Sequence, residues 1–424
     1  MKKLLSVVLC AVLLFGALCV PAMAVDAENY ANIMYQCYTY LGDSISWGYG
    51  LDPNSDNHDP YSVGARVEGS FTDLVADVLE MNNGTVIHPA ASSGSRLCDF
   101  RILLERGMGV ENPYDRENDW YGNRHPERTE RLREMGPQFC EWLRESDLVT
   151  LQAGINDLTA ALVNAASATG IVDLNQITQI SDASGVAAYL KTVMRNLAQD
   201  PNVLGNLVGT FHSEVEGIRV NAAEVVKDIV KLTPENATIL IVGYHKAAQG
   251  FRVIPDTDFS PIFDLIDAAL ISLNDYFASV ASNYPNVYYV DAPDASVFFP
   301  AGTTLVDALK QTDKILWGIH PDAAGHDYIA QCVLNELNAL NTCRHTHTDK
   351  VGPDVKLPFG WKHECAEVCT DCGKVLNLGK TVTPDGSNIT VPTHTITNAA
   401  DNVRNAVSSI VSRITLGLFS RTRP

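Results

Sequence analysis

The sequence predicts a three-layer α/β/α sandwich around a mainly parallel five-stranded sheet, followed by a small C-terminal appendage. Short β-rich apolar runs alternate with helical stretches, and small or polar turn residues follow several of the runs. The expected strands lie near 37–41, 85–88, 148–153, 238–243 and 287–291. Such alternation favours parallel strands with helices on both faces of the sheet. Ligands of such sheets bind where the strands end, so functional residues are expected there.

The first 24 residues have the organisation of a secretory signal peptide. Two lysines follow Met1, an apolar run covers 4–20, and Ala22-Met23-Ala24 provides small residues for cleavage. We expect cleavage after Ala24 and a secreted protein; the alternative is a retained membrane anchor. Elsewhere the sequence has no uninterrupted apolar run of about 18 residues, so we do not expect the mature chain to span a membrane.

The most informative segment is 40–48, with the sequence YLGDSISWG. It places Ser44 in a tight turn directly after the first predicted strand. A serine at the carboxyl end of a strand, beside a helix N-terminus, is well placed to act as a nucleophile. These few residues can also occur by chance in a chain of this length, so the prediction depends on the segments that follow.

Two further turns follow predicted strands. Gly94, in the segment 89–95, can bring a backbone N–H close to a substrate oxygen; an ordinary strand-to-helix turn is the alternative. Asn156, in the segment 154–157, can direct its side-chain amide at a developing oxyanion. The alternative is that Asn156 and Asp157 cap a helix beginning at Leu158.

His320 lies in the segment 320–326, HPDAAGH, just before a helix expected over 324–340. A single histidine in a loop is usually only solvated. Paired with Ser44, however, His320 has the chemistry of a general base.

Together these four segments resemble the SGNH hydrolase family, also called GDSL esterases and lipases. The resemblance covers about 35–340 and implies a flavodoxin-like fold. It implies Ser44 as nucleophile and His320 as base. It also implies an oxyanion hole formed by the backbone N–H groups of Ser44 and Gly94 and the Asn156 side chain. The Gly-x-Ser-x-Gly motif of ordinary α/β-hydrolases does not occur at Ser44.

The sequence departs from the family at one position. The family usually carries an aspartate three residues before the histidine, and here that residue is Trp317. Because the His320 ring must be held with Nδ1 protonated, we expect the backbone carbonyl of Trp317 to accept that hydrogen bond. Asp313 or Asp322 is the alternative partner, although Asp322 also suits the cap of the next helix. A site that has lost its activity is the remaining alternative.

Two other segments of the catalytic region stand out. We expect 105–128, which is polar, to form a surface loop, and 158–235 to form a long, mostly helical insertion. The insertion either packs as an extra helical layer or forms a lid or wall that shapes the substrate pocket. His245 follows the fourth strand and has either a structural role or a place in the cleft.

The composition narrows the choice of partners. The net charge of −19 disfavours binding to nucleic acid and to anionic lipid surfaces. Cys37, Cys98, Cys140 and Cys332 lie in the catalytic region, and an exported protein can pair such residues in disulfides. Buried free thiols are the alternative.

The chain divides into a signal peptide (1–24), a catalytic domain (25–341), a small Cys/His module (342–379) and a linker with an amphipathic C-terminal helix (380–424). In the small module, a Cys-x-x-Cys-Gly sequence can present two thiolates to one metal ion. We predict a structural zinc site like that of a zinc ribbon, and two disulfides are the alternative. The candidate ligands are Cys343, His345 or His347, Cys369 and Cys372, with His363 and Cys365 as further candidates.

The tail has apolar residues at helical spacing between Val403 and Leu418, and several arginines. It either docks on its own domain or contacts a membrane surface, the cell envelope or a partner. For the whole chain we expect a secreted serine esterase whose substrate is a lipid, a small ester or an acetylated carbohydrate, with no cofactor in catalysis. The alternatives are an acyltransferase on the same scaffold and a non-catalytic surface-binding protein.

Overall fold

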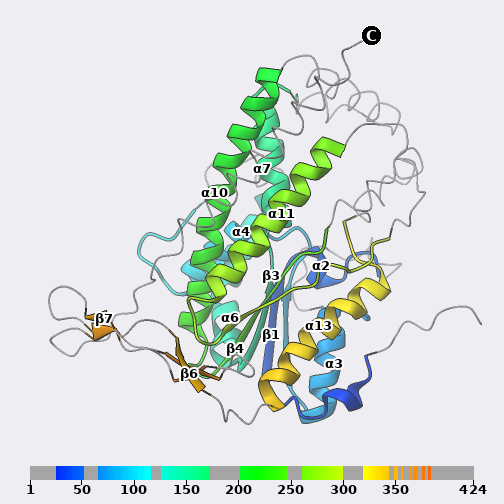
Figure 1. Ribbon diagram of the computed structural model, residues 1–424, viewed down its shortest axis with the longest axis vertical. Coiled ribbons are helices and arrows are strands. Elements are labelled where there is room, and N and C mark those ends of the chain that lie inside the picture. Colours follow the sequence, from blue (N-terminus) through cyan, green and yellow to red (C-terminus); the bar gives the residue numbers. More distant parts are fainter. Residues whose placement is uncertain are drawn as a thin grey trace, which may run out of the picture.

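The computed structural model describes residues 25–51, 65–115, 126–171, 173, 201–246, 260–298 and 319–342, together with six short strands between 348 and 382. Its centre is a parallel sheet with the strand order β2-β1-β3-β4-β5 (Figure 1). The strands are β1 (Cys37–Gly42), β2 (Val86–Ala91), β3 (Leu148–Gln152), β4 (Thr238–Val242) and β5 (Val287–Val290). The structure therefore confirms the predicted fold class and all five strands.

The central strands of the sheet are covered on both faces, and a strand in that position needs apolar side chains on both sides. Every residue of β1, β3 and β4 is buried, which explains their continuous apolar sequence. β2 extends further than predicted and includes Pro89, which the sequence pattern placed in the turn. Proline is tolerated there because β2 is an edge strand that pairs only with β1.

The order of the strands decides which face each helix covers. The connection from β1 to β2 runs in one direction along the sheet, and the later connections run in the other. Because parallel crossovers are right-handed, α3 (Phe71–Asn83) covers one face. α4 (Leu97–Gly107), α6 (Pro126–Glu145), α10 (Pro201–Leu232) and α11 (Ser260–Ala281) cover the opposite face (Figure 1).

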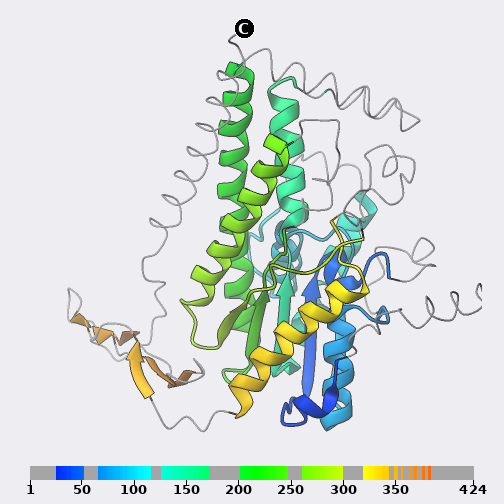
Figure 2. The same cartoon turned by 45° about the vertical axis from the view of Figure 1, so that its right-hand side comes forward.

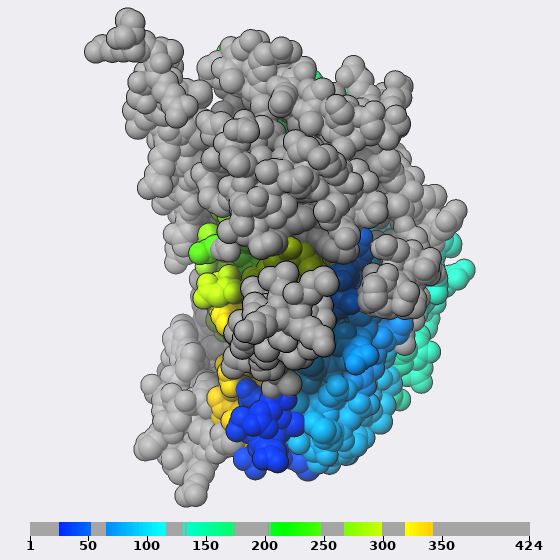
Figure 3. Space-filling view, turned by 90° about the vertical axis from the view of Figure 1, so that its right-hand side faces the viewer, coloured from blue at the N-terminus to red at the C-terminus, as the bar shows by residue number. Residues whose placement is uncertain are grey.

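The last helix of the domain, α13 (Ala323–Thr342), lies beside α3 on the first face (Figure 2). It confirms the helix predicted over 324–340 and extends it slightly. Figure 3 shows this side of the molecule, where the blue residues of η1 (Ala27–Tyr30) and α3 adjoin the yellow surface of α13. The residues before β1 and those after β5 thus close the same layer.

The predicted helical insertion is present as α7 (Ile155–Ala168) and α10, with the segment 174–200 outside the described residues. α7 rises from the carboxyl edge of the sheet, and the upper parts of α10 and α11 pack beside it (Figure 1). Leu207, Phe211 and Val215 of α10 are buried, as expected for an extra helical layer. Whether this layer also acts as a lid stays a prediction.

Two smaller predictions can be compared with the structure. The expected loop over 105–128 is wrong at both ends, because 105–107 belong to α4 and 126–128 to α6. Cys37, Cys98, Cys140 and Cys332 are free thiols.

The six C-terminal strands form two small antiparallel sheets, with the orders β10-β9-β6 and β11-β8-β7. They are β6 (Thr348–Val351), β7 (Val355–Lys356), β8 (Lys362–His363), β9 (Ala366–Cys369), β10 (Val375–Asn377) and β11 (Thr381–Val382).

The strand order also fixes where a ligand can bind. The chain passes from β1 to β2 on one side of β1 and later reaches β3 on the other side of β1. The order of the strands therefore reverses between β1 and β3. In open α/β sheets a crevice forms at this point, outside the carboxyl ends of the strands. Ser44, two residues after the last residue of β1, lies at this point of the sheet.

Candidate active site

Ser44 is the first residue of the short helix α2 (Ser44–Trp47), which begins immediately after β1. Asp43 caps this helix, since its Oδ1 accepts a hydrogen bond from the Ile45 N–H at 2.9 Å. The helix ends at Gly48, whose φ of 89° is unfavourable for residues with a side chain. At Gly42 a Cβ atom would overlap the Ser46 side chain. The turn around Ser44 thus depends on small residues on both sides.

Asp43 also connects this turn to two neighbouring elements. The Tyr244 hydroxyl, just past β4, donates to Asp43 Oδ2 at 2.6 Å and accepts from the Ile155 N–H at 3.3 Å. Asp43 is fully buried, and burial raises the pKa of its carboxyl to about 7. This link joins the Ser44 turn to the start of α7, where Asn156 lies. No sequence pattern assigned a role to Tyr244, because nothing local indicates its partner.

His320 lies in the loop before α13, and its Nε2 is 2.7 Å from Ser44 Oγ. Both side chains are buried, with 4% and 7% of their surface exposed. The Tyr49 ring lies against the imidazole, with the ring centres 4.7 Å apart. A serine hydroxyl in this arrangement can pass its proton to the imidazole while the oxygen attacks an electrophile.

Gly94 and Asn156 lie at the same edge of the sheet as Ser44. Gly42, at the end of β1, is paired with Ala91 of β2 and Gln152 of β3. The loops that follow the three strands therefore start from one level. Gly94 has a φ of 76°, and the Asn156 side-chain amide donates to the Ser95 carbonyl at 3.1 Å. Since an amide nitrogen carries two N–H groups, this bond leaves Asn156 a second donor.

The capping alternative for Asn156 and Asp157 is wrong in its details. α7 begins at Ile155, and Gly154 takes the cap position. Asp157 instead accepts from the Leu97 N–H at 2.8 Å and so caps the neighbouring helix α4. The segment 154–157 therefore supplies both the Asn156 amide near Ser95 and the Asp157 carboxyl that caps α4.

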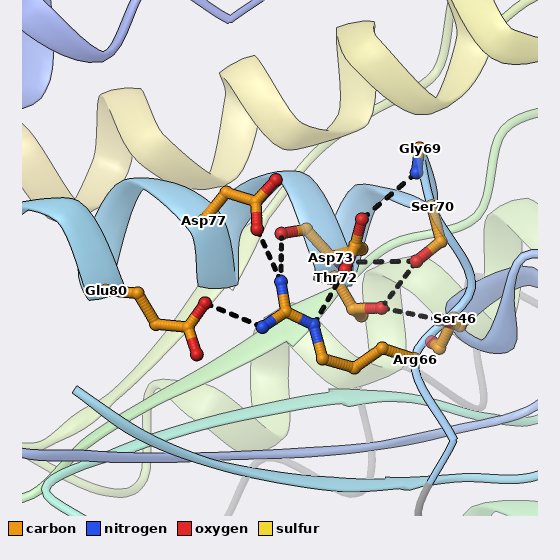
Figure 4. Close-up of polar contacts among 8 residues, drawn as sticks. All are labelled: Ser46, Arg66, Gly69, Ser70, Thr72, Asp73, Asp77 and Glu80. Carbon is orange, nitrogen blue, oxygen red and sulfur yellow. Dashed lines mark hydrogen bonds and ion pairs between the residues drawn. The ribbon is translucent and has the colours of Figure 1, made fainter. Parts of the chain in front are cut away.

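A polar network at the start of α3 supports α2 from the other side (Figure 4). The Thr72 hydroxyl donates to the Ser46 carbonyl at 2.7 Å, and Ser70 caps α3 by accepting from the Asp73 N–H at 3.2 Å. The Arg66 guanidinium contacts Asp73 at 2.7 Å. It also reaches Asp77 and Glu80, at 2.5 Å and 2.7 Å. The segment before α3 is thus fixed to the helix that carries Thr72. Neither Arg66 nor Thr72 lies in a sequence motif that points to function.

A family model described as the GDSL-like Lipase/Acylhydrolase family matches residues 40–328, which include Ser44, Gly94, Asn156 and His320. The chain belongs to this family. Membership makes this GDSL-family protein a carboxylic ester hydrolase. No curated protein matches the chain at a significant level.

The GDSL-family chain is also similar to solved structures. An extracellular lipase from Streptomyces rimosus is 16% identical with a TM-score of 0.42, over 71% of this chain and 99% of that protein. Lipase Lip_vut3 from a goat rumen metagenome is 14% identical with a TM-score of 0.36, over 70% and 95%. Phospholipase A1 from Streptomyces albidoflavus is 17% identical with a TM-score of 0.34, over 71% and 98%.

Two of the three candidate partners for His320 Nδ1 in this GDSL-family protein, Trp317 and Asp313, lie outside the described residues. Asp322, the third, caps α13: its Oδ1 accepts from the Gly325 N–H at 2.8 Å and from the Ser296 hydroxyl at 2.5 Å. Asp322 is therefore already engaged as a helix cap, as the sequence favoured.

The remaining sequence predictions concern the ends of the chain. The signal peptide and the C-terminal helix lie outside the described residues, and so do the side chains of Cys343, His345, His347, Cys369 and Cys372. Among the side chains that are described, no three or more acidic, histidine or cysteine residues are grouped so that they could hold a metal ion. Within that part of the chain, no helix is long and apolar enough to cross a membrane.

Proposed function

We propose that this hydrolase is a secreted serine esterase in which Ser44 is the nucleophile and His320 is the general base. The observation that carries the proposal is the buried hydrogen bond of 2.7 Å between Ser44 Oγ and His320 Nε2. An alcohol is a weak nucleophile at neutral pH, and an adjacent imidazole activates it by taking its proton.

In the first half of the reaction, Ser44 Oγ attacks the carbonyl carbon of the ester while its proton moves to His320 Nε2. His320 then returns the proton to the leaving alcohol as the carbon–oxygen bond breaks, which leaves an acyl group on Ser44. In the second half, His320 takes a proton from water, the water oxygen attacks the acyl carbon, and Ser44 leaves with that proton. The products are a carboxylic acid and a regenerated serine.

The oxyanion of each tetrahedral intermediate needs donors that are already in place. We assign the backbone N–H groups of Ser44 and Gly94 and the amide of Asn156 to this role. Three features support the assignment: the common level of the strand ends, the positive φ of Gly94, and the second N–H of Asn156. One donor of this kind contributes roughly 3 kcal/mol to transition-state stabilisation.

For the orientation of the imidazole, we assign the backbone carbonyl of Trp317 as the acceptor from His320 Nδ1. Trp317 occupies the sequence position of the usual aspartate. The use of Asp322 as the cap of α13 supports this choice, because that carboxylate already accepts two hydrogen bonds.

The substrate is a carboxylic ester, and we place the reaction outside the cell. The arrangement of Lys2, Lys3, an apolar run and Ala22-Met23-Ala24 supports export with cleavage after Ala24. An extracellular lipase and a phospholipase are among the similar solved structures. Lipids, small esters and acetylated carbohydrates are the substrate classes to compare.

We further propose a structural zinc ion in the C-terminal module. Antiparallel pairing places Thr348, the first residue of β6, opposite Cys369, the last residue of β9. His347 directly precedes Thr348, and Cys372 lies in the connection from β9 to β10. Both halves of the proposed ligand set therefore start from the same end of one small sheet.

The test of the catalytic proposal is a series of aryl esters of increasing acyl length, hydrolysed by the mature protein and by Ser44→Ala. We expect the variant to fold, to lose the burst of released phenol and to lose turnover. Ser46→Ala is the matched control, since it removes another buried hydroxyl from the same short helix. The control should retain most of the activity. Near-normal turnover by folded Ser44→Ala would exclude Ser44 as the nucleophile.

A further inference from the structure

His245, just past β4, has a buried imidazole that the proposed reaction does not use. Its Nε2 is 2.9 Å from the carbonyl oxygen of Ile319, and only 1% of the residue is exposed. A carbonyl oxygen can only accept a hydrogen bond, so Nε2 must carry the proton. Ile319 directly precedes His320. The bond therefore holds the peptide group that joins these two residues.

The other side of this loop is held by backbone contacts with the segment 296–298. The carbonyl of His320 accepts from the Phe298 N–H at 3.4 Å, and Pro321 forms a bridge with Val297. The Asp322 N–H donates to the Ser296 carbonyl at 3.1 Å. These contacts fix the chain after His320, whereas His245 fixes the peptide group before it.

His245 is uncharged at neutral pH, because burial lowers the pKa of its imidazole to about 4. A second buried histidine, His326 on α13, accepts from the Phe71 N–H at 3.2 Å through Nδ1. Burial and the proximity of His320 and His245 lower the pKa of His326 to about 3. Both neighbours thus stay neutral and do not oppose the positive charge that His320 gains when it takes a proton.

We propose that His245 is a positioning residue: its Nε2–H holds the Ile319 carbonyl and thereby keeps the His320 imidazole in reach of the Ser44 hydroxyl. This inference rests on the proposed roles of Ser44 and His320. Since a misplacement of about 1 Å can slow an enzyme roughly 100-fold, loss of this single bond should be visible in the rate of the chemical step.

The test compares three substitutions of His245 in the mature, full-length protein. His245→Leu removes the hydrogen-bond donor and replaces the imidazole with an apolar side chain of similar size. His245→Gln keeps a donor, because the amide nitrogen of glutamine is separated from Cα by the same number of bonds as Nε2 of histidine. His245→Asn also keeps an amide, but one bond shorter, so its N–H falls short of the Ile319 carbonyl.

The probe is a fluorophosphonate, which reports on Ser44 without a full catalytic cycle. Ser44 Oγ attacks phosphorus, fluoride leaves, the serine proton moves to His320, and an oxygen–phosphorus bond remains. Mass spectrometry gives both the labelled position and the fraction labelled at saturation. The saturation value counts correctly folded sites, and the rate constant reports how well each folded site is arranged.

We expect full labelling at saturation in all three variants, but at different rates. His245→Leu and His245→Asn should react roughly 10-fold to 100-fold more slowly than the unmodified protein, whereas His245→Gln should remain within about 3-fold of it. Hydrolysis of a short aryl ester should show the same order in kcat with little change in KM, because substrate binding is not altered.

A matched control separates positioning from general loss of stability. The buried Thr85 hydroxyl donates to backbone carbonyls of Tyr35 and Leu79 at the opposite end of the sheet. Thr85→Val removes a buried donor to a carbonyl, as His245→Leu does. It should lower the melting temperature without changing the labelling rate constant of Ser44.

Three results would overturn the inference. His245→Leu could react at the unmodified rate, it could lose only labelled fraction at an unchanged rate constant, or His245→Gln could be as slow as His245→Leu. If His245→Leu does not fold, the difference between the Gln and Asn variants still decides. Failure of the proposed function looks different: the unmodified protein would not be labelled at Ser44, or Ser44→Ala would retain its turnover.

Discussion

Ser44 and His320 lie 276 residues apart in the chain, yet their side chains share a hydrogen bond of 2.7 Å. Each is presented by a local feature, Ser44 by the turn after β1 and His320 by the loop before α13. Their meeting depends on buried groups that hold both loops, among them Asp43, Tyr244 and His245. At this scale, small displacements decide the rate.

Asn156→Ala tests the assigned oxyanion donor. The amide interacts most strongly with the negative oxygen of the transition state, so its removal should lower kcat by about 100-fold to 1,000-fold. KM should change much less. Steady-state kinetics on an aryl ester gives both values, and circular dichroism checks the fold. A change confined to KM would instead assign Asn156 to substrate binding.

Asp157→Asn tests how a buried carboxyl couples stability to pH. Burial raises the pKa of Asp157 to about 7, whereas the carboxyl of an unfolded aspartate has a pKa of about 3.9. The folded protein therefore holds the proton more tightly, and the resulting stabilisation is present below about pH 4 and is lost as the pH rises to about 7. From about pH 5 to about pH 8, this group should lower the unfolding free energy of the unmodified protein by up to about 3 kcal/mol.

Urea denaturation of both proteins at these two pH values provides the measurement. The amide that replaces the Asp157 carboxyl cannot ionise, so the variant should show a smaller loss of stability between them. Asp43 also has a raised pKa, and the charge of Asp157 is one of the causes that raise it, so part of the difference between the two proteins comes from Asp43. An unchanged pH dependence would show that Asp157 does not titrate in this range.

At the scale of elements, helix caps as well as strand ends position the loops that carry Ser44, Asn156 and His320. Asp43 caps α2, Asp157 of α7 caps α4, and Asp322 caps α13. Each carboxylate satisfies backbone N–H groups that a helix start leaves without partners. The acidic residues near Ser44 and His320 therefore act as helix caps. A comparison of sequence motifs alone would not distinguish this structural role from a catalytic one.

Asp322→Asn distinguishes a helix cap from a triad carboxylate that orients His320. Asparagine is itself a good helix cap, so the variant should fold and lose far less than the roughly 10,000-fold in kcat that follows loss of a true triad aspartate. Measurement of kcat on an aryl ester is sufficient, together with the melting temperature. A loss of several thousand-fold in a folded variant would make Asp322 the partner of His320 and exclude the Trp317 carbonyl.

At the scale of the whole molecule, the residues proposed for catalysis and the C-terminal module occupy separate stretches of the chain. Ser44, Gly94, Asn156 and His320 all lie within the family match at 40–328, and the small sheets begin later, at Thr348. The proposed chemistry moves protons between a serine, a histidine and water, so it needs no metal ion. The proposed zinc ion would serve the module alone.

Metal analysis of the mature protein, purified without chelator, tests this separation. We expect about one zinc ion per chain if Cys343, Cys369, Cys372 and a histidine form the site. Removal of zinc by a chelator should destabilise the module while esterase activity survives. A metal-free protein without free thiols in the module would show that disulfides hold the module together. Loss of esterase activity when zinc is removed would show that catalysis depends on the module.

The sequence by itself determined the five strands, the helix after His320 and the residues at which function was sought. These features are local: apolar runs predict buried strands, and a serine or histidine beside a strand end or helix start is visible in a few consecutive residues. Pro89 was misassigned because its place on an edge strand depends on the order of strands in the sheet.

Only the tertiary structure decided which groups meet. The bond from Tyr244 to Asp43, the capping of α4 by Asp157 and the contact of His245 with Ile319 join segments from different loops. No local pattern encodes such pairs, because they follow from strand order, crossover handedness and the packing of α3 and α13 on one face. Burial, which moves the pKa of Asp43 upward and that of His245 downward, arises from the same packing.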